Sequence, residues 1–418
     1  MRLILLLLAL VLGFGTAGWA KPARNQVTVD LTIQPATHSF SCRYTLTTTA
    51  PAAVSQLGLN LNRQFRLATI TGPQVTRFTA APWYDSFQKD TLQRLSVAFS
   101  GPQRRPRLTV EYGGQLPERF YTDSLAELTA FANWLPNLPD REYELVDYQL
   151  TVHVPVGFRV VSTHEPRRVR PGEYYFTGTA PNIELTAVAA RSFTTLVAAG
   201  SPQIVIHKAN RPATHLDTVL LSQAQAMIRW QNQTIGRQEP IRQFTFLLPG
   251  TNRNASGLLD NAAVITYSDF DPRRTGELLI LAHEISHKWW GYGTWNDYNN
   301  WLNEGMATYS SLLYLRTTGD TARFRQELAK RRTSAASVGA VIGFDVRRND
   351  YPTFRKAMYD KPTVILYELE QRLGTEVFLQ LLATAAAAHL ATTEEFLTLV
   401  ERQTSRATRD WLAGKLST

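Results

Sequence analysis

The stretch His283-Glu284-Ile285-Ser286-His287 and the stretch Trp301-Leu302-Asn303-Glu304-Gly305 decide the fold of the second half of this chain. Residues four apart lie on one face of an α-helix, so both histidines point to the same side. Apolar residues recur around each stretch at helical spacing, which predicts two buried helices. We expect the first to begin at Asp271-Pro272, with an Asp cap and Pro in the first turn, and the second to run from about Trp301 to Leu315.

The donor atoms of these two helices suit a metal ion. His283, His287 and Glu304 would supply two nitrogens and one carboxylate to a tetrahedral Zn²⁺ and leave the fourth position to water. Glu284 lies between the histidines and can act on that water without binding the metal. The competing interpretation is a surface helix with two histidines around a solvated glutamate. Two motifs on two buried helices favour a zinc hydrolase with one Zn²⁺ per chain.

The residues around the metal ligands resemble a known family. The first motif continues as His-Lys-Trp-Trp-Gly, and Glu304 lies in Trp-Leu-Asn-Glu-Gly-Met-Ala-Thr-Tyr. This is similar to the gluzincin zinc aminopeptidases, the group of aminopeptidase N and leukotriene hydrolase. The family has 18 residues between the second histidine and the glutamate, and this chain has 16. The resemblance implies a thermolysin-like, mainly helical catalytic domain, and the shorter loop bears on the shape of the substrate pocket.

A second segment of the resemblance concerns the substrate. Gly257-Leu258-Leu259-Asp260-Asn261 occupies the place of the family's Gly-x-Met-Glu-Asn, a strand edge whose glutamate binds the free α-amine. The resemblance implies substrate binding by Gly257, Asp260 and Asn261, with Asp260 one methylene shorter than the usual residue. The alternative for Asp260-Asn261 is an ordinary turn before a buried strand.

Two further residues are expected near the metal. Met358-Tyr359-Asp360-Lys361-Pro362 resembles the family's Tyr-x-Lys-Gly segment, which implies that Tyr359 stabilises the oxyanion, although Pro362 replaces the usual glycine. A core or rim aromatic is the alternative for Tyr359. Thr308, one helical turn after Glu304, is a candidate to orient a ligating histidine.

The first half of the chain has a different pattern. Alternating apolar and polar runs such as 27–33, 43–47 and 148–154 are separated by Pro, Gly and Asn, which predicts antiparallel strands. The fold class is therefore α+β. We expect a β domain over 21–199, saddle-shaped by the resemblance, and a catalytic domain over 200–418. The larger relatives continue into a helical domain, so this chain is expected to be a short form with a more open cleft.

The amino terminus predicts export. Met1-Arg2 precedes an apolar run of about a dozen residues and a small-residue site that ends at Ala20, which is typical of a cleaved signal peptide over 1–20. A periplasmic or secreted protein follows, and an uncleaved membrane anchor is the alternative. The mature chain has no other stretch long enough to cross a membrane. The single cysteine, Cys42, excludes an intramolecular disulfide and is expected as a buried free thiol.

The formal charge of +9 and the pI of 9.6 do not by themselves indicate nucleic-acid binding. The basic residues are scattered and no nucleic-acid motif accompanies them, so we expect a peptide or protein as the partner. The sequence thus predicts an exported zinc metallopeptidase, and an aminopeptidase by the resemblance. Glu284 is its general base and acid. A zinc hydrolase of non-peptide substrates and a zinc-stabilised binding protein without turnover are the alternatives.

Overall fold

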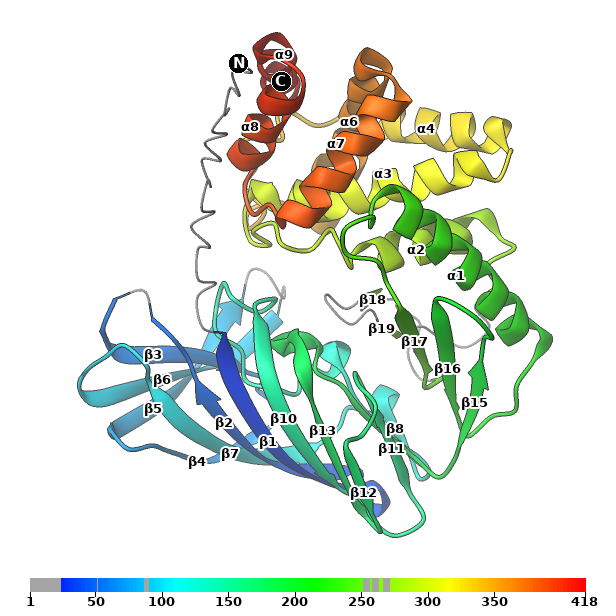
Figure 1. Ribbon diagram of the computed structural model, residues 1–418. Helices are drawn as coiled ribbons and strands as arrows, with labels where there is room; N and C mark the ends of the chain where they lie inside the picture. Colours follow the sequence, from blue (N-terminus) through cyan, green and yellow to red (C-terminus); the bar gives the residue numbers. More distant parts are fainter. Residues whose placement is uncertain (1–23, 51, 86–89, 251–255, 258–262, 266–270) are drawn as a thin grey trace, which may run out of the picture.

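The computed structural model describes residues 24–50, 52–85, 90–250, 256–257, 263–265 and 271–418. Figure 1 shows a β-rich domain below and a mainly helical domain above, joined along one side. The strands of the first domain are β1 (Asn25–Gln34), β2 (Ser39–Thr47), β3 (Val54–Leu61), β4 (Arg66–Thr71), β5 (Val75–Asp85), β6 (Asp90–Gln103), β7 (Arg107–Gln115), β8 (Tyr121–Thr122), β9 (Leu125–Leu128), β10 (Leu145–His153), β11 (Arg159–Ser162), β12 (Arg168–Arg170), β13 (Glu173–Pro181) and β14 (Ala187–Ala190).

The second domain begins with β15 (Phe193–Val197) and continues through strands into helices. Its further strands are β16 (Gln203–Ala209), β17 (Gln243–Leu248), β18 (Ser256–Gly257) and β19 (Ala263–Ile265). Its α-helices are α1 (His215–Thr234), α2 (Thr275–Ser286), α3 (Trp301–Thr317), α4 (Thr321–Ala335), α5 (Tyr351–Arg355), α6 (Lys361–Leu373), α7 (Thr375–Ala388), α8 (Thr393–Gln403) and α9 (Arg406–Leu416). Short helical segments are η1 (Pro35–Thr37), η2 (Glu118–Phe120), η3 (Ala130–Ala132), η4 (Asn182–Glu184), η5 (Tyr298–Asn300) and the π-helix η6 (Lys356–Asp360).

The amino-terminal domain consists of three sheets. The largest has the strand order β12-β13-β10-β1-β2-β7-β4, and along β1 every second residue is buried, as period-2 alternation predicts. The predicted antiparallel pairing holds for the neighbours in this sheet except β1 and β10, which are parallel. Parallel neighbours need a long crossover, and the chain between β1 and β10 supplies it; this chain forms β2, β4 and β7 of the same sheet and strands of the other two sheets.

The second domain begins with a mixed sheet of order β15-β16-β17-β19-β18. Strands β16, β17 and β19 are parallel, and β15 and β18 lie antiparallel at its two edges. β15 pairs with β16, although it precedes the boundary that we placed between residues 199 and 200. By strand pairing, the second domain therefore starts at Phe193 or just before it.

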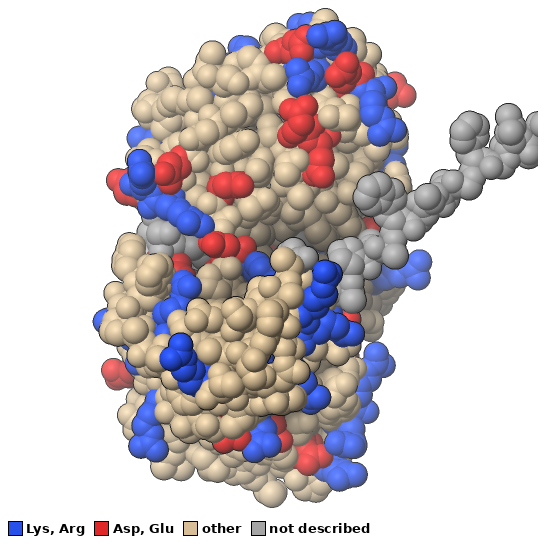
Figure 2. All heavy atoms as spheres, turned by 90° about the vertical axis from the view of Figure 1, so that its left-hand side faces the viewer, with Lys and Arg blue, Asp and Glu red and all other residues tan. Residues whose placement is uncertain are grey.

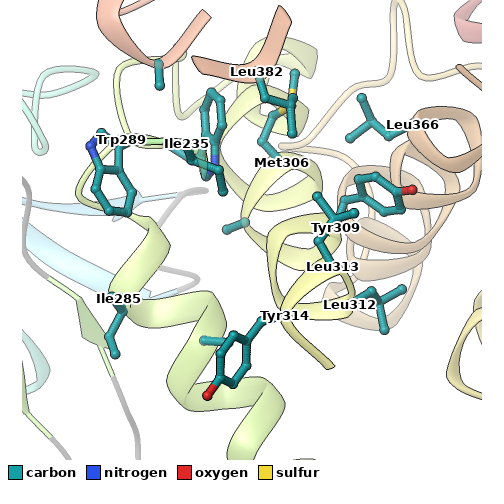
Figure 3. Close-up of a cluster of buried hydrophobic side chains, with 14 of the residues drawn as sticks. Ile235, Ile285, Trp289, Met306, Tyr309, Leu312, Leu313, Tyr314, Leu366 and Leu382 are labelled. Atoms are coloured by element: carbon teal, nitrogen blue, oxygen red, sulfur yellow. The ribbon is translucent and has the colours of Figure 1, made fainter. Parts of the chain in front are cut away.

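The two helices that carry the histidine and glutamate motifs are buried where the sequence predicted them. α3 is buried on all sides from Trp301 to Leu315, which is the behaviour of a core helix. Figure 3 shows Ile285, Trp289, Met306 and Leu313, which belong to one buried hydrophobic cluster.

The predicted start of α2 was wrong by one turn. α2 begins at Thr275, and Asp271 instead closes a preceding turn in which the Arg274 amide donates to the Asp271 carbonyl at 3.0 Å. The Arg273 guanidinium donates a hydrogen bond to the Asp271 carboxylate at 2.7 Å. The Asp271 side chain therefore stabilises the turn and does not cap the helix. At the far end of the domain, α8 begins with a capping box formed by Thr392 and Glu395.

A π-helical segment, η6, lies between α5 and α6 and carries Tyr359. Pro362 follows it in the first turn of α6; proline lacks an N–H and crowds the carbonyl four residues back, and a π-turn relieves both effects. A Cβ on Gly305 of α3 would come within 2.6 Å of the Pro362 Cβ and 3.2 Å of the Met358 carbonyl. Glycine next to Glu304 thus lets α3 approach the segment that holds Tyr359.

The single cysteine has the state that the sequence predicts. Cys42 is a free, buried cysteine, and burial raises the pKa of its thiol to about 12. Among the described residues, no helix combines the length and the apolar composition needed to cross a bilayer. Figure 2 shows basic groups dispersed over the face that it displays and mixed with acidic groups at the helical end.

Glu370 of α6 connects three parts of the helical core. Its carboxylate is fully buried and accepts from Arg316 at 2.7 Å, from Thr375 at 2.8 Å and from the Tyr309 hydroxyl. Burial works against ionisation of Glu370, but these donors outweigh it and hold its pKa below the ordinary value. A carboxylate that is buried but fully hydrogen-bonded is stable inside a protein.

Replacing Glu370 by Gln should lower the free energy of unfolding by about 3 kcal/mol, because it leaves the Arg316 charge without its partner. Because the folded pKa is depressed, the Glu370 contribution is present above the unfolded pKa and is lost as the pH falls through the folded pKa. Urea unfolding at pH 7 and pH 3 measures both effects. Glu376→Gln, on the exposed first turn of α7, is the control; equal stability of the two variants would contradict this assignment.

Candidate metal centre and active site

His283, His287 and Glu304 come together in one cluster. The Nε2 atoms of the two histidines are 3.1 Å apart, and the Glu304 Oε2 lies 3.1 Å from His283 Nε2 and 3.7 Å from His287 Nε2. All three potential ligand atoms lie within 4.8 Å of one another. α2 supplies the histidines on one helical face, and α3, packed against α2, supplies the glutamate.

The geometry of the cluster fits one zinc ion. Two ligands about 2.0–2.1 Å from a tetrahedral Zn²⁺ are roughly 3.3 Å apart, close to the separations of this cluster. The Glu304 Oε2 is buried and has no hydrogen-bond partner, which is costly for a carboxylate oxygen unless a cation completes it. Burial works against ionisation of Glu304, but the two imidazoles outweigh it and hold its pKa below the ordinary value.

Each histidine has a partner on its other ring nitrogen. The His287 Nδ1 lies 2.6 Å from the Trp290 carbonyl, so that nitrogen carries a proton and Nε2 is left with a lone pair for a metal. The Thr308 hydroxyl donates to the Glu304 carbonyl at 2.6 Å and lies 3.4 Å from the His283 Nδ1, where it can accept the ring proton. Thr308 therefore stands where the sequence suggested an orienting residue.

Tyr359 lies beside the cluster. Its ring stacks on His283 with the centroids 5.8 Å apart and the planes inclined by 8°, and its hydroxyl faces the Glu304 carboxylate. Burial, and then the charge of Glu304, raises the pKa of Tyr359 well above its ordinary value. The hydroxyl therefore keeps its proton at neutral pH and can donate a hydrogen bond at the metal cluster.

The remaining predicted residues lie at the edge of the sheet. Gly257 ends β18, which pairs with β19 at the margin of the five-stranded sheet and contacts α2. Gly257 thus lies on a strand edge beside the helix of Glu284. Asp260 and Asn261 lie outside the described residues.

The amino-terminal domain reaches the loop that joins the two metal-binding helices. The Tyr143 ring stacks on Trp295 of this loop with the centroids 4.1 Å apart, and Trp295 in turn lies 6.0 Å from the His287 ring. Asp140 accepts from Asn296 of the same loop at 2.6 Å and from Arg347 at 2.5 Å. The β domain therefore supports the position of the second histidine.

These contacts were not predicted from the sequence. The Trp290 carbonyl is a backbone group, and Tyr143 is far from the motifs along the chain.

Comparison with known proteins identifies the class. Residues 257–410 match the peptidase family M1 domain. Endoplasmic reticulum aminopeptidase 2 of Bos taurus is 30% identical over 151 residues, which cover 30% of this chain and 15% of that protein. A two-domain M1 zinc metallopeptidase bound to L-tryptophan is 19% identical with a TM-score of 0.72, and the match covers 94% of each chain. The M1 zinc metallopeptidase of Deinococcus radiodurans is 18% identical with a TM-score of 0.71 over 94% of this chain and 93% of its own.

Residues 257–410 are thus similar to the peptidase family M1 domain. They follow an amino-terminal β domain, and the fold of the whole chain is that of the two-domain M1 metallopeptidase structures. The predicted resemblance, fold class and zinc cofactor are confirmed. The segment shared with the curated aminopeptidase is a small part of that protein, so the similarity extends to the catalytic domain alone.

The purified protein should contain close to one zinc per chain.

Thr308→Val should weaken zinc affinity by about 10–100-fold, because it removes the acceptor for the His283 ring proton. Competition with a zinc-binding dye measures the affinity. Thr317→Val on the same helix is the control, since its hydroxyl also donates to a helix carbonyl but faces away from the metal cluster. Equal affinities of the two variants would exclude the orienting role.

Proposed function

We propose that this protein is an exported zinc metallopeptidase that hydrolyses peptide bonds at the amino terminus of its substrates. The observation that carries the proposal is the buried Glu304 oxygen that converges with two imidazole nitrogens on one point, with Glu284 between the two histidines. The similarity of residues 257–410 to peptidase family M1 supports the reaction class.

The reaction needs a water, a base and a donor for the oxyanion. His283, His287 and Glu304 would hold a zinc ion, which would supply an activated water at neutral pH and polarise the substrate carbonyl. Glu284 accepts the proton of the attacking water and delivers it to the leaving amine. The Tyr359 hydroxyl, which keeps its proton, donates to the negative oxygen of the tetrahedral intermediate.

The aminopeptidase part of the proposal depends on recognition of a free amine. Endoplasmic reticulum aminopeptidase 2, which shares the catalytic segment, is named for this activity, and one of the similar structures holds a free amino acid. In this chain the Gly257 strand edge lies beside α2, and Asp260 would provide a carboxylate that selects for a charged amino terminus.

The zinc-loaded protein should release the first residue of a free peptide and leave its N-acetylated form intact. Glu284→Gln should lower kcat by about 10²–10⁴-fold with the zinc content unchanged, because it removes the base but no ligand. Tyr359→Phe should lower kcat by about 10²–10³-fold. Chromatography of the products measures the preference for the free peptide and the kcat of each variant.

The other outcomes distinguish the alternatives. Cleavage of acetylated peptides would indicate an endopeptidase, and turnover of amides or epoxides alone would indicate a non-peptide hydrolase. A zinc-loaded protein that turns over none of these would be a binding protein. Full activity of Glu284→Gln would overturn the mechanism.

Export is supported by the charged and apolar residues that precede Ala20. The mature protein recovered from the periplasm or the medium should begin at Lys21, which amino-terminal sequencing measures. An intact Met1 on a membrane-associated protein would show an uncleaved anchor instead.

A further inference from the structure

Arg355 ends α5 and lies beside Tyr359, the tyrosine at the metal cluster. The guanidinium carbon of Arg355 is 4.4 Å from the centroid of the Tyr359 ring, and that ring stacks on His283 with the centroids 5.8 Å apart. The Nη1 of Arg355 makes one long contact, to the Tyr351 hydroxyl at 3.4 Å. Arg355 is exposed, so a bound molecule can reach its guanidinium. A positive charge therefore lies one tyrosine ring away from a metal ligand.

Arg355 lacks the carboxylate partner that neighbouring guanidiniums have. Arg347 of the same segment pairs with Asp140 at 2.5 Å. Arg331 of α4 pairs with Asp360, so the acidic residue that follows Tyr359 is already neutralised. Among the described residues, no carboxylate oxygen lies within 4.0 Å of the Arg355 guanidinium. A guanidinium carries five N–H donors in a fork that matches a carboxylate, and those of Arg355 are available to a ligand.

The place of Arg355 fits the leaving-group side of a bound peptide. The strand edge of Gly257, on the amine side of the proposed substrate, contacts α2, whereas the π-segment that follows Arg355 packs against α3. The metal cluster lies between these two helices, so the two segments flank it. An extended peptide advances about 3.3–3.6 Å per residue. A carboxylate on the first or second residue after the scissile bond therefore comes within reach of Arg355 when Tyr359 donates to the scissile carbonyl oxygen.

We propose that Arg355 is a specificity-determining residue that binds a carboxylate of the substrate on the leaving-group side of the scissile bond. That carboxylate is the carboxyl terminus of a short peptide or an acidic side chain at the same position, since both present the same two oxygens to the guanidinium. The inference rests on the proposed peptidase function and adds to it a preference for short or acidic peptides.

Arg355 has a second possible role, because a cation over a tyrosine ring also holds that ring in place. The two roles act on different quantities. Loss of an orienting group would lower kcat for every substrate through Tyr359. Loss of a carboxylate anchor lowers kcat/KM only for substrates that carry the carboxylate, and mainly through KM.

The test compares the tripeptide Leu-Ala-Ala with its carboxyl-terminal amide. Arg355→Gln removes the charge and should lower kcat/KM for the free acid by about 10–100-fold, with the amide and the zinc content unaffected. Arg355→Lys keeps the charge without the fork and should show a smaller loss. Arg332→Gln is the matched control and should behave as the wild type, because the Arg332 guanidinium stacks on Tyr367 at 5.2 Å instead of on Tyr359.

The peptide Leu-Asp-amide, which carries its carboxylate only on a side chain, distinguishes the two sources. Equal losses for Leu-Ala-Ala and Leu-Asp-amide in Arg355→Gln would show that either carboxylate is bound, and a loss for one alone would identify the source. A fall in kcat that is the same for Leu-Ala-Ala and its amide would overturn the inference and leave Arg355 as an orienting residue. Unchanged kinetics of Arg355→Gln with all three peptides would overturn it as well.

Binding separates this inference from the proposed function. The zinc-loaded Glu284→Gln protein keeps every metal ligand, and calorimetry with Leu-Ala-Ala and its amide reports carboxylate recognition without turnover. If this protein binds the acid more tightly and the added Arg355→Gln change abolishes the difference, Arg355 binds the carboxylate whether or not the wild type cleaves peptides. A difference that persists in the double variant, or no difference in the Glu284→Gln protein, would contradict the assignment.

Discussion

The structure of the catalytic domain depends on one costly placement, the burial of Glu304 in the middle of the core helix α3. A carboxylate oxygen without a donor in such surroundings is unstable unless positive charge reaches it. The two imidazoles of α2 converge on that oxygen, but neutral imidazoles alone do not supply the charge. A divalent cation does, so metal binding and the packing of α2 against α3 stabilise one another.

The amino-terminal domain completes this arrangement from outside. Only a loop joins α2 to α3, and a loop would not fix the direction of His287 by itself. Tyr143 and Asp140 of the β domain hold Trp295 and Asn296 of the loop, while Asp140 also holds Arg347 on the segment that leads to Tyr359. The two sides of the metal cluster are therefore tied to the same turn of the first domain.

The sequence predicted the elements whose signals are local. Helical periodicity placed α3 to within a few residues, and the spacing of the two histidines placed them on one face. The alternation of apolar and polar residues did not predict the parallel pairing of β1 with β10, because the partner of a strand depends on residues far away in the sequence. The turn at Asp271 was mistaken for a helix cap, since Asp followed by Pro suits either. The π-segment at Tyr359 results from Pro362 meeting the close approach of Gly305, a contact between distant residues.

Three buried glutamates show how function can be separated from stability in this fold. Glu370 accepts hydrogen bonds from Arg316, Thr375 and Tyr309. Its buried carboxylate is therefore satisfied by groups of the chain itself, and it stabilises the core. Glu304 and Glu184 each keep a buried oxygen that no described group satisfies. A fold tolerates such oxygens where binding of a ligand offsets the free energy lost on desolvation of the oxygen. The unsatisfied oxygen of Glu304 coincides with the cluster that a metal ion would complete, whereas Glu370 needs no ligand.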